Sequence, residues 1–310
     1  MKKLFTVSVC LSLFLMMNSH AGASETKKQS LKLSNGVTYY GEVKNGKPHG
    51  RGTMKYSPNK SFEGEWQNGK RNGQGKLVNT EIIKVEPSGS EDVYSNKSRE
   101  IEVYKGTWLN DQFSGSGLHT YSSVFKEFNT DENNVKTERF MDFTYRAEKG
   151  VFRNSKLISG YSGAWSKDSS DLSYIDSKVS FSMFSDRDWH MTNLAWSEFT
   201  HLDYIGYSKK VNQSDYNLTI YQNEIREGTF SKDQIVNGTT IYNNSNSSYY
   251  TYMKEDYKNG AVFNGQELNY EKFSDTRNKY LEKYVSLIKP YSKGLYDLTA
   301  ILISLEKENN

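Results

Sequence analysis

Residues 186–204, DRDWHMTNLAWSEFTHLDY, hold the densest group of side chains that could do chemistry. His190 and His201 lie eleven residues apart, with Asp186, Asp188 and Asp203 close by in the sequence. Imidazoles and carboxylates supply acid–base groups and metal ligands. However, the intervals are not those of a metal motif, and no Gly-x-Ser-x-Gly nucleophile elbow is present. Ordinary packed residues of a β segment are the favoured interpretation. A hydrolase or effector site within residues 160–225 is the alternative.

A second candidate site, of the phosphate-binding kind, lies nearer the N-terminus. Residues 41–47 and 64–70 match most of the phosphate-binding pattern G-x-x-x-x-G-K. The next residue should be a Ser or Thr that holds magnesium, but it is Pro48 in one case and Arg71 in the other. We therefore predict no nucleotide or other cofactor and no nucleic-acid partner. We also assign no catalytic residue and no metal ligand.

Both matches instead belong to a repeat. An aromatic residue, a glycine and then Val or Trp alternate along the chain, starting at Tyr39, Phe62 and Tyr104. Each of these starts precedes a glycine-rich return segment that opens a further strand. The repeat glycines are Gly41, Gly46, Gly50, Gly52, Gly64, Gly69, Gly73, Gly75, Gly106, Gly115 and Gly117. Self-similarity at a fixed spacing indicates a repeat array and outweighs a match to one isolated motif.

The physical meaning of the repeat follows from its alternation. Period two places the aromatic, the glycine and the Val or Trp on one face of a strand. The glycine leaves room for large rings to lie over the backbone. Asn45-Gly46 and Asn68-Gly69 are typical of tight hairpin turns, because both residue types tolerate positive φ. Each unit is thus predicted as a β-hairpin that stacks on its neighbours to bury the aromatic stripe.

Three later segments follow a looser version of the pattern. The intervals Phe152 to Gly160, Phe230 to Gly238 and Tyr257 to Gly265 are each eight residues, against seven from Tyr39 to Gly46. We predict these segments as variant hairpins with one extra loop residue.

The three clear repeats, at residues 39–56, 62–77 and 104–121, resemble the MORN family, the "membrane occupation and recognition nexus" repeat. The resemblance covers about a fifth of the chain. It implies an elongated, twisted antiparallel sheet of successive hairpins that serves as a scaffold or binding surface. It also implies that dimers are common and lipid contact occurs in some members. It does not imply catalysis by the repeats.

Two groups of residues are candidates for binding. One is the aromatic stripe, which is expected to form the core or, as an alternative, a contact platform: Tyr39, Phe62, Trp66, Tyr104 and Trp108. The other is a set of basic residues at the hairpin turns, which are either solvated tips or contacts to an anionic partner: Lys44, Lys47, Arg51, Lys70 and Arg71. Residues 24–77 carry eleven Lys and Arg against four Glu, so the N-terminal part is basic.

The N-terminus has the pattern of a cleavable signal peptide. Lys2 and Lys3 precede an apolar run from residue 4 to residue 17, and Ala21-Gly22-Ala23 forms a small-x-small cleavage signal. The short charged region is typical of a bacterial secreted protein. The only cysteine, Cys10, lies inside this run, so no disulfide and no thiol chemistry is expected after cleavage. We therefore predict a periplasmic or secreted location.

The domain organisation follows from these patterns. The hydrophobic fraction is 35% and aromatics make up 14% of the residues, which favours an extended β architecture with a thin aromatic core. We predict a signal peptide at 1–23, repeats at 24–121 with an insertion at 78–103, degenerate hairpins at 122–270, and helices at 271–310. Apolar residues at helical spacing from Phe273 to Leu287 and from Leu295 to Leu305, separated by Pro290, predict a helical cap.

The fold class is therefore mainly β, an elongated sheet of stacked hairpins with a C-terminal helical cap. The predicted function is a non-enzymatic scaffold of the cell envelope or exterior that engages a protein partner along its sheet. One alternative is binding of an anionic membrane or glycolipid through the basic repeats. A homodimer is compatible with the family resemblance.

Overall fold

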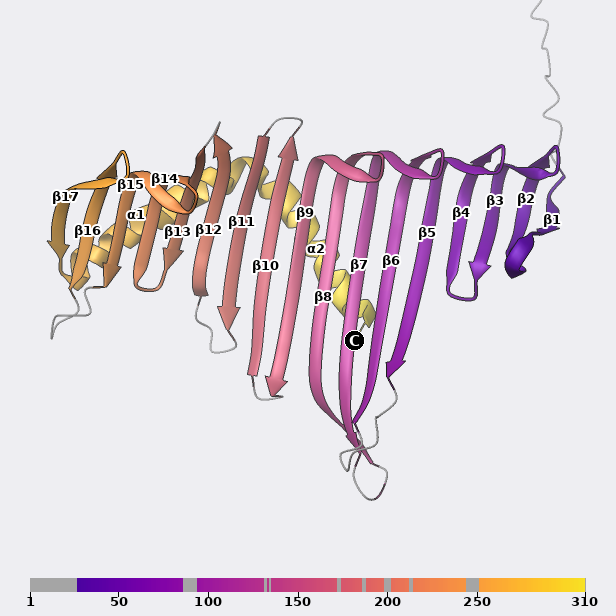
Figure 1. The fold of residues 1–310 in the computed structure, drawn as a ribbon, viewed down its shortest axis with the longest axis horizontal. Coiled ribbons are helices and arrows are strands. Elements are labelled where there is room, and N and C mark those ends of the chain that lie inside the picture. The colour runs from indigo at the N-terminus through magenta and orange to yellow at the C-terminus, as the bar shows by residue number, and fades with distance from the viewer. Residues whose placement is uncertain are drawn as a thin grey trace, which may run out of the picture.

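The described part of the chain forms a single antiparallel sheet with two α-helices. The computed structural model describes residues 27–85, 94–130, 133, 135–171, 174–185, 188–197, 202–211, 214–243 and 251–309. Seventeen strands form one sheet, and each strand pairs with the next one along the chain. Figure 1 shows the resulting elongated meander, with β1 and β17 at its two ends. The predicted hairpin sheet is confirmed.

The strands differ in length along the sheet. The shorter ones lie towards its ends, and the longest lie near the middle (Figure 1). Their bounds are β1 Gln29–Lys32, β2 Thr38–Lys44, β3 Lys47–Ser57, β4 Lys60–Gln67, β5 Lys70–Val85, β6 Tyr94–Leu109, β7 Gln112–Thr130, β8 Lys136–Arg153, β9 Lys156–Asp171, β10 Tyr174–Ser185, β11 Asp188–Ser197, β12 Leu202–Val211, β13 Ser214–Tyr221, β14 Glu224–Ser231, β15 Gln234–Asn243, β16 Tyr252–Lys258 and β17 Ala261–Leu268.

Two-residue turns connect six of the hairpins at one edge of the sheet. In each turn both residues have positive φ, which is the backbone of a type I′ turn. Asn stands first in five of them, because its short side chain tolerates the left-handed region. The six turns are Asn45-Gly46, Asn68-Gly69, Asn110-Asp111, Asn154-Ser155, Lys232-Asp233 and Asn259-Gly260. We call this edge the turn edge.

Paired glycines below the turns allow aromatic rings to lie on the backbone. Gly64 faces Gly75 across β4 and β5, two residues beyond the pair formed by Phe62 and Leu77. A Cβ built on Gly75 would lie 2.3 Å from Cζ of Phe62, so only glycine fits beneath that ring. The same relation holds for Tyr39 over Gly52 and Tyr104 over Gly117.

The later hairpins differ from the early ones in the return strand and not in the loop. Their turns also have two residues, so the predicted extra loop residue is wrong. In the early hairpins five residues separate the turn from the paired glycine (Gly52, for example), and in the late ones only four do (Gly160, for example). In the early hairpins the additional residue lies in the bulge of the return strand, which contains a glycine of positive φ. These glycines are Gly50, Gly73 and Gly115.

Three clusters of buried side chains make up the core. The repeat cluster contains the aromatic stripe, the middle cluster packs against α2 (Ser292–Asn309), and the end cluster packs against α1 (Tyr270–Ile288). In β7, His119 faces the repeat rings while Val124 faces α2, so strand alternation puts the two on opposite faces. The repeat core and the helices therefore cover different faces of one sheet.

The C-terminal helices lie across a face of the sheet. The 3₁₀ turn Lys289–Tyr291, which contains Pro290, separates α1 from α2. Phe273 stacks on Tyr252 with 3.8 Å between ring centroids, and Leu298 and Leu302 are buried in the middle cluster. Figure 1 shows both helices running diagonally over the sheet. The predicted helices are present, but they leave residues 261–267 of the edge strand β17 exposed.

The segments that the sequence marks as interruptions extend the strands. Val78–Val85 continues to pair with β6, and residues 122–128 continue to pair with β8. The alternating segment around Phe181 and Met183 is part of β10, with both side chains buried. The predicted signal peptide lies outside the described residues.

Replacing Trp108 by Ala tests the repeat core. Its ring is 1% exposed and lies 5.1 Å from the centroids of both Phe62 and Tyr104. Removing a ring packed on several sides leaves a cavity, so we expect a loss of about 3 to 5 kcal/mol in the free energy of unfolding. Urea denaturation measures it. Tyr296→Ala, at a side chain that is 77% exposed, is the control and should change stability little. An unchanged Trp108→Ala midpoint would refute the packing.

Candidate functional site

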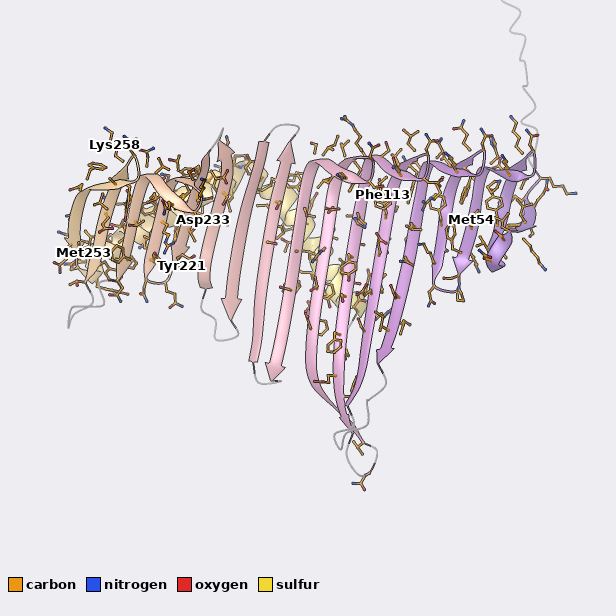
Figure 2. The ribbon with its side chains drawn as sticks, in the orientation of Figure 1. Met54, Phe113, Tyr221, Asp233, Met253 and Lys258 are labelled. Atoms are coloured by element: carbon orange, nitrogen blue, oxygen red, sulfur yellow. The ribbon has the colours of Figure 1, made fainter. Side chains whose placement is uncertain are left out.

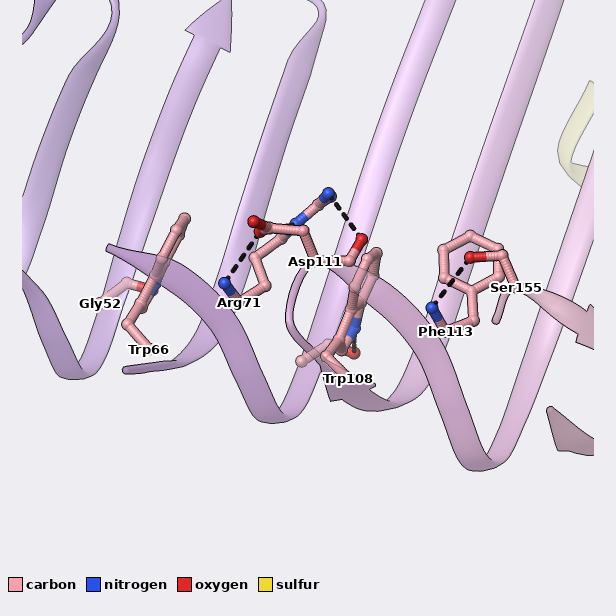
Figure 3. A network of polar contacts seen from close by, with 8 residues as sticks. Gly52, Trp66, Arg71, Trp108, Asp111, Phe113 and Ser155 are labelled. Atoms are coloured by element: carbon pink, nitrogen blue, oxygen red, sulfur yellow. Dashed lines mark hydrogen bonds and ion pairs between the residues drawn. The ribbon is translucent and has the colours of Figure 1, made fainter. Parts of the chain in front are cut away.

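Neighbouring hairpins are joined to one another along the turn edge. The second turn residue of one hairpin donates its backbone N–H to a carbonyl of the preceding hairpin. The distances are 2.9 Å from Gly69 to Pro48, 3.1 Å from Asp111 to Arg71 and 3.1 Å from Ser155 to Phe113. In addition, the indole Nε1 of Trp66 donates to the carbonyl of Gly52 at 3.0 Å (Figure 3). These bonds hold successive turns in a fixed row.

Arg71 reinforces this row. Its Nε donates to Oδ1 of Asp111 at 3.0 Å and Nη2 donates to the Asp111 carbonyl at 3.0 Å (Figure 3). The guanidinium also lies 4.3 Å from the ring centroid of Trp108, within the range of a cation–π contact. Arg71 is therefore a structural residue that links two hairpins, whereas the sequence offered it as a binding residue.

A row of exposed cations lines the turn edge. Lys44 and Lys47 flank the first turn, Lys70 follows the second, and the fourth, fifth and sixth described turns add further Lys and Arg. Within the described residues none of these side chains has an ion-pair or hydrogen-bond partner. We define the basic turn edge as Lys44, Lys47, Lys70, Arg153, Lys156, Lys232 and Lys258.

This edge carries a clear excess of positive charge. Asp111 and Asp233 are the acidic residues in the six turns, and Asp111 is bound to Arg71. The turns that carry these cations lie at one edge of the sheet. Figure 1 shows that edge along one long side of the molecule, and Figure 2 shows Lys258 at the far end of that side. Such an arrangement can attract an extended anionic surface. Arg51, also a predicted contact, is exposed on β3.

The aromatic candidates lie in the core and not on a surface. Tyr39, Phe62, Trp66, Tyr104 and Trp108 are between 0% and 4% exposed. Rings buried to this extent present no area to a partner. Their role in the structure is packing, and we do not retain the contact platform. The exposed lysines from the sequence prediction are the ones that remain available for contact.

A half-buried charged cluster ends the aromatic core, and sequence reasoning did not single it out. His119 in β7 lies between two carboxylates, with Nε2 3.0 Å from Oε1 of Glu102 and Nδ1 3.1 Å from Oε2 of Glu148. Glu148 occupies the position held by Tyr39, Phe62 and Tyr104 in the earlier repeats, two residues before a paired glycine. A glutamate at this aromatic position was the signal in the sequence that could have revealed the cluster.

The two carboxylates keep His119 protonated. Burial alone would lower the pKa of His119, but the hydrogen bonds to Glu102 and Glu148 and their negative charges raise it to about 9. The hydrogen bond with His119 in turn lowers the pKa of Glu102. A cavity of about 330 Å³ beside the cluster is lined by Tyr121 and Arg146 together with these three residues. The aromatic core of the repeats therefore ends at a charged cluster, which stands where a further aromatic ring would lie.

The histidines that suggested chemistry in the sequence are only partly described. His190 belongs to β11, but its side chain lies outside the described atoms, as does all of His201. The enzyme alternative in residues 160–225 therefore stays a prediction. Among the residues that are described, no three His, Asp or Glu are arranged to hold a metal ion. Neither α1 nor α2 contains a segment long and apolar enough to cross a membrane.

Comparison with known proteins agrees with the repeat geometry. A model of the MORN repeat matches residues 39–60, 62–79 and 104–123, which together are about a fifth of the chain. These matches cover the three hairpins in which a ring lies on paired glycines. A search of curated proteins found no match.

The pH dependence of stability tests the His119 cluster. In the unfolded chain His119 has an ordinary pKa near 6.5. Since the folded pKa is about 9, the stabilisation is complete below about pH 6.5 and is lost as pH rises through about 9. The side chain is 24% exposed, so we expect a contribution on the order of 2 kcal/mol. His119→Gln should cost that much more at pH 6 than at pH 10 in urea denaturation. A cost that does not vary with pH would contradict this.

Proposed function

Because residues 39–123 carry three MORN repeats, which are generally modules that bind proteins or membranes, we propose that this chain is a non-enzymatic scaffold. It binds an acidic protein partner along the basic turn edge. The observation that carries this proposal is the row of seven exposed cations without partners among the described residues. Hydrogen bonds between successive hairpins fix the spacing of the cations from Lys44 to Lys156, and a further bond from Gly260 to Val236 links the hairpins that carry Lys232 and Lys258.

Charge and rigidity both support binding at this edge. Exposed lysines steer an anionic partner towards the surface and fix its orientation more than they add affinity. The partner need not order the edge first, since the turns are already held by backbone bonds from Gly69 to Pro48 and from Asp111 to Arg71. A preorganised surface loses less conformational entropy on binding than a flexible one.

The proposed setting is the periplasm, the cell envelope or the exterior. It rests on the signal-peptide pattern of residues 1–23 and on the lack of cysteine after residue 10. In such a place a cysteine-free sheet that is held by packing and backbone hydrogen bonds needs no disulfides.

An anionic membrane is the second candidate for the partner. Figure 1 shows the turns along one long side of the sheet, so several lysines can face a flat bilayer at once. Each Lys or Arg close to an anionic membrane surface contributes about 1 kcal/mol. The same lysines would then serve both candidates, and the experiment must separate the two.

Charge reversal at the basic turn edge tests the proposal. We expect Lys44→Glu, Lys47→Glu and Lys70→Glu together to weaken partner binding by roughly ten- to a hundredfold, because like charges then face each other. Lys32→Glu, Lys55→Glu and Lys60→Glu form the matched control, since these exposed lysines of β1, β3 and β4 lie towards the edge of the sheet opposite to the turns. Immobilised wild-type and variant chains are exposed to extract from the source cells at low and high salt, and the retained proteins are identified by mass spectrometry.

A parallel measurement separates membrane from protein. Co-sedimentation uses phosphatidylcholine vesicles with and without phosphatidylglycerol. A protein retained by wild type and control but lost in the charge-reversal variant and at high salt supports the first candidate. Capture by anionic vesicles with the same dependence supports the second. If neither protein nor vesicle binding depends on these lysines, the proposed edge is wrong.

A further inference from the structure

The hairpin of β14 and β15 keeps the glycines of the repeat but lacks its ring. Gly228 pairs with Gly238, as Gly64 pairs with Gly75 in the repeats. Two residues before this pair stands Arg226, at the position that Phe62 occupies, and Thr240 lies opposite. The three heavy atoms nearest to a Cβ built on Gly238 are backbone atoms of β14, whereas the atom nearest to a Cβ on Gly75 belongs to the Phe62 ring.

The missing ring leaves a slot between two aromatic side chains. In the repeats, Phe62 packs between Trp66 of its own hairpin and Trp108 of the next one. The ring centroids are 5.1 Å apart on each side. Phe230 and Tyr257 take the positions of these two tryptophans, each two residues before its turn. An open cleft of about 860 Å³ occupies this place, with Phe230, Tyr257 and Arg226 among its lining residues.

The cleft has room for a chain and not only for one ring. Its lining extends from Tyr221 and Asn243 at one end of the hairpin to Asp233 in the turn at the other. Tyr221 ends β13 at the edge opposite to the turns, whereas Asp233 lies in a turn of the turn edge. The eight residues of β14 span about 23 Å at roughly 3.3 Å per residue.

The polar groups of the cleft are planar donors and acceptors. Nε of Arg226 donates to Oε1 of Glu224 at 2.6 Å, and its terminal nitrogens have no partner among the described residues. The amide residues Gln222, Asn223 and Asn243 also line the cleft, and Oδ1 of Asn223 accepts a hydrogen bond from the hydroxyl of Tyr252 at 3.4 Å. Each offers donors and acceptors side by side, which is what a hydroxyl group needs.

Glu255 holds two of the three tyrosines that line the cleft. Tyr242 donates its hydroxyl to Oε1 of Glu255 at 3.1 Å, and Tyr257 donates to Oε2 at 2.7 Å. Because both hydroxyls are bound to the same carboxylate, the ring faces are fixed before a ligand arrives. With Glu224, Asp233 and Glu255 against the single cation Arg226, the cleft is negative overall and disfavours an anionic ligand.

We propose that this cleft binds a neutral oligosaccharide. Sugar rings present an apolar face of C–H groups that packs on tyrosine and phenylalanine, and hydroxyls at their edge that bond to amide, carboxylate and guanidinium groups. One pyranose ring occupies the slot that the repeat ring fills elsewhere, and the adjoining sugar residues of the chain lie along the rest of the cleft. This site lies away from the N-terminal lysines and uses a different chemistry, so it goes beyond the proposed function.

Titration calorimetry with defined saccharides tests the site. The probes are chitotetraose, cellotetraose and maltotetraose as neutral chains, a heparin tetrasaccharide as an anionic one, and N-acetyltyrosinamide as a free aromatic ring. We expect at least one neutral chain to bind the full chain. Arg226→Ala and Tyr242→Ala should each weaken that binding at least tenfold, and Tyr296→Ala, an exposed tyrosine of α2, should leave it unchanged.

The other outcomes overturn the proposal. These are no binding of any neutral chain, binding of heparin alone, binding of N-acetyltyrosinamide alone, or neutral-chain binding that the cleft variants leave unchanged. Circular dichroism establishes that each variant is folded. Tyr221→Ala, which removes a partly exposed cleft side chain, replaces any variant that does not fold. Charge reversal of Lys44, Lys47 and Lys70 should not affect saccharide binding, so failure of either proposal can be told from failure of the other.

Discussion

The contact between an aromatic ring and a pair of facing glycines is the constraint on which the rest of the repeat structure depends. A ring such as Phe62 lies directly on two backbones because neither Gly64 nor Gly75 has a Cβ. The next tryptophans then pack edge-on against it, and the bulged strand brings each turn close enough to bond to the preceding one. Without that contact the hairpins would have neither a core nor a fixed row of turns.

Departures from this contact coincide with the polar sites of the molecule. Where Glu148 replaces the ring, a protonated His119 and two carboxylates close the core. Where Arg226 replaces it, an open cleft forms between Phe230 and Tyr257. In both places the glycine pair is retained, at Gly150–Gly160 and at Gly228–Gly238. The sheet thus continues unchanged while its face becomes available for other chemistry.

Local signals in the sequence predicted the hairpins and helices, whereas contacts between distant residues were beyond it. Asn-Gly turns and aromatic alternation indicate hairpins because both act within a few residues. The pairing of Arg71 with Asp111, forty residues away, has no such signal. The same holds for the position of α1 and α2. Amphipathic spacing shows that one side of a helix is buried, but it does not show against which face of the sheet. The sequence misleads about the late hairpins because Phe152 precedes a glycine in the way that Tyr39 does, although in the structure it occupies the place of Trp66.

The most direct test of the ring–glycine contact is the stability of two matched glycine variants. Gly75→Ala places a methyl group within 2.3 Å of the Phe62 ring, whereas a Cβ on Gly265 meets no atom within 4 Å. We predict that Gly75→Ala lowers the free energy of unfolding by about 1 to 3 kcal/mol, through overpacking. Gly265→Ala should leave it unchanged or raise it by about 0.5 kcal/mol. Equal effects of the two substitutions in urea denaturation would contradict the account.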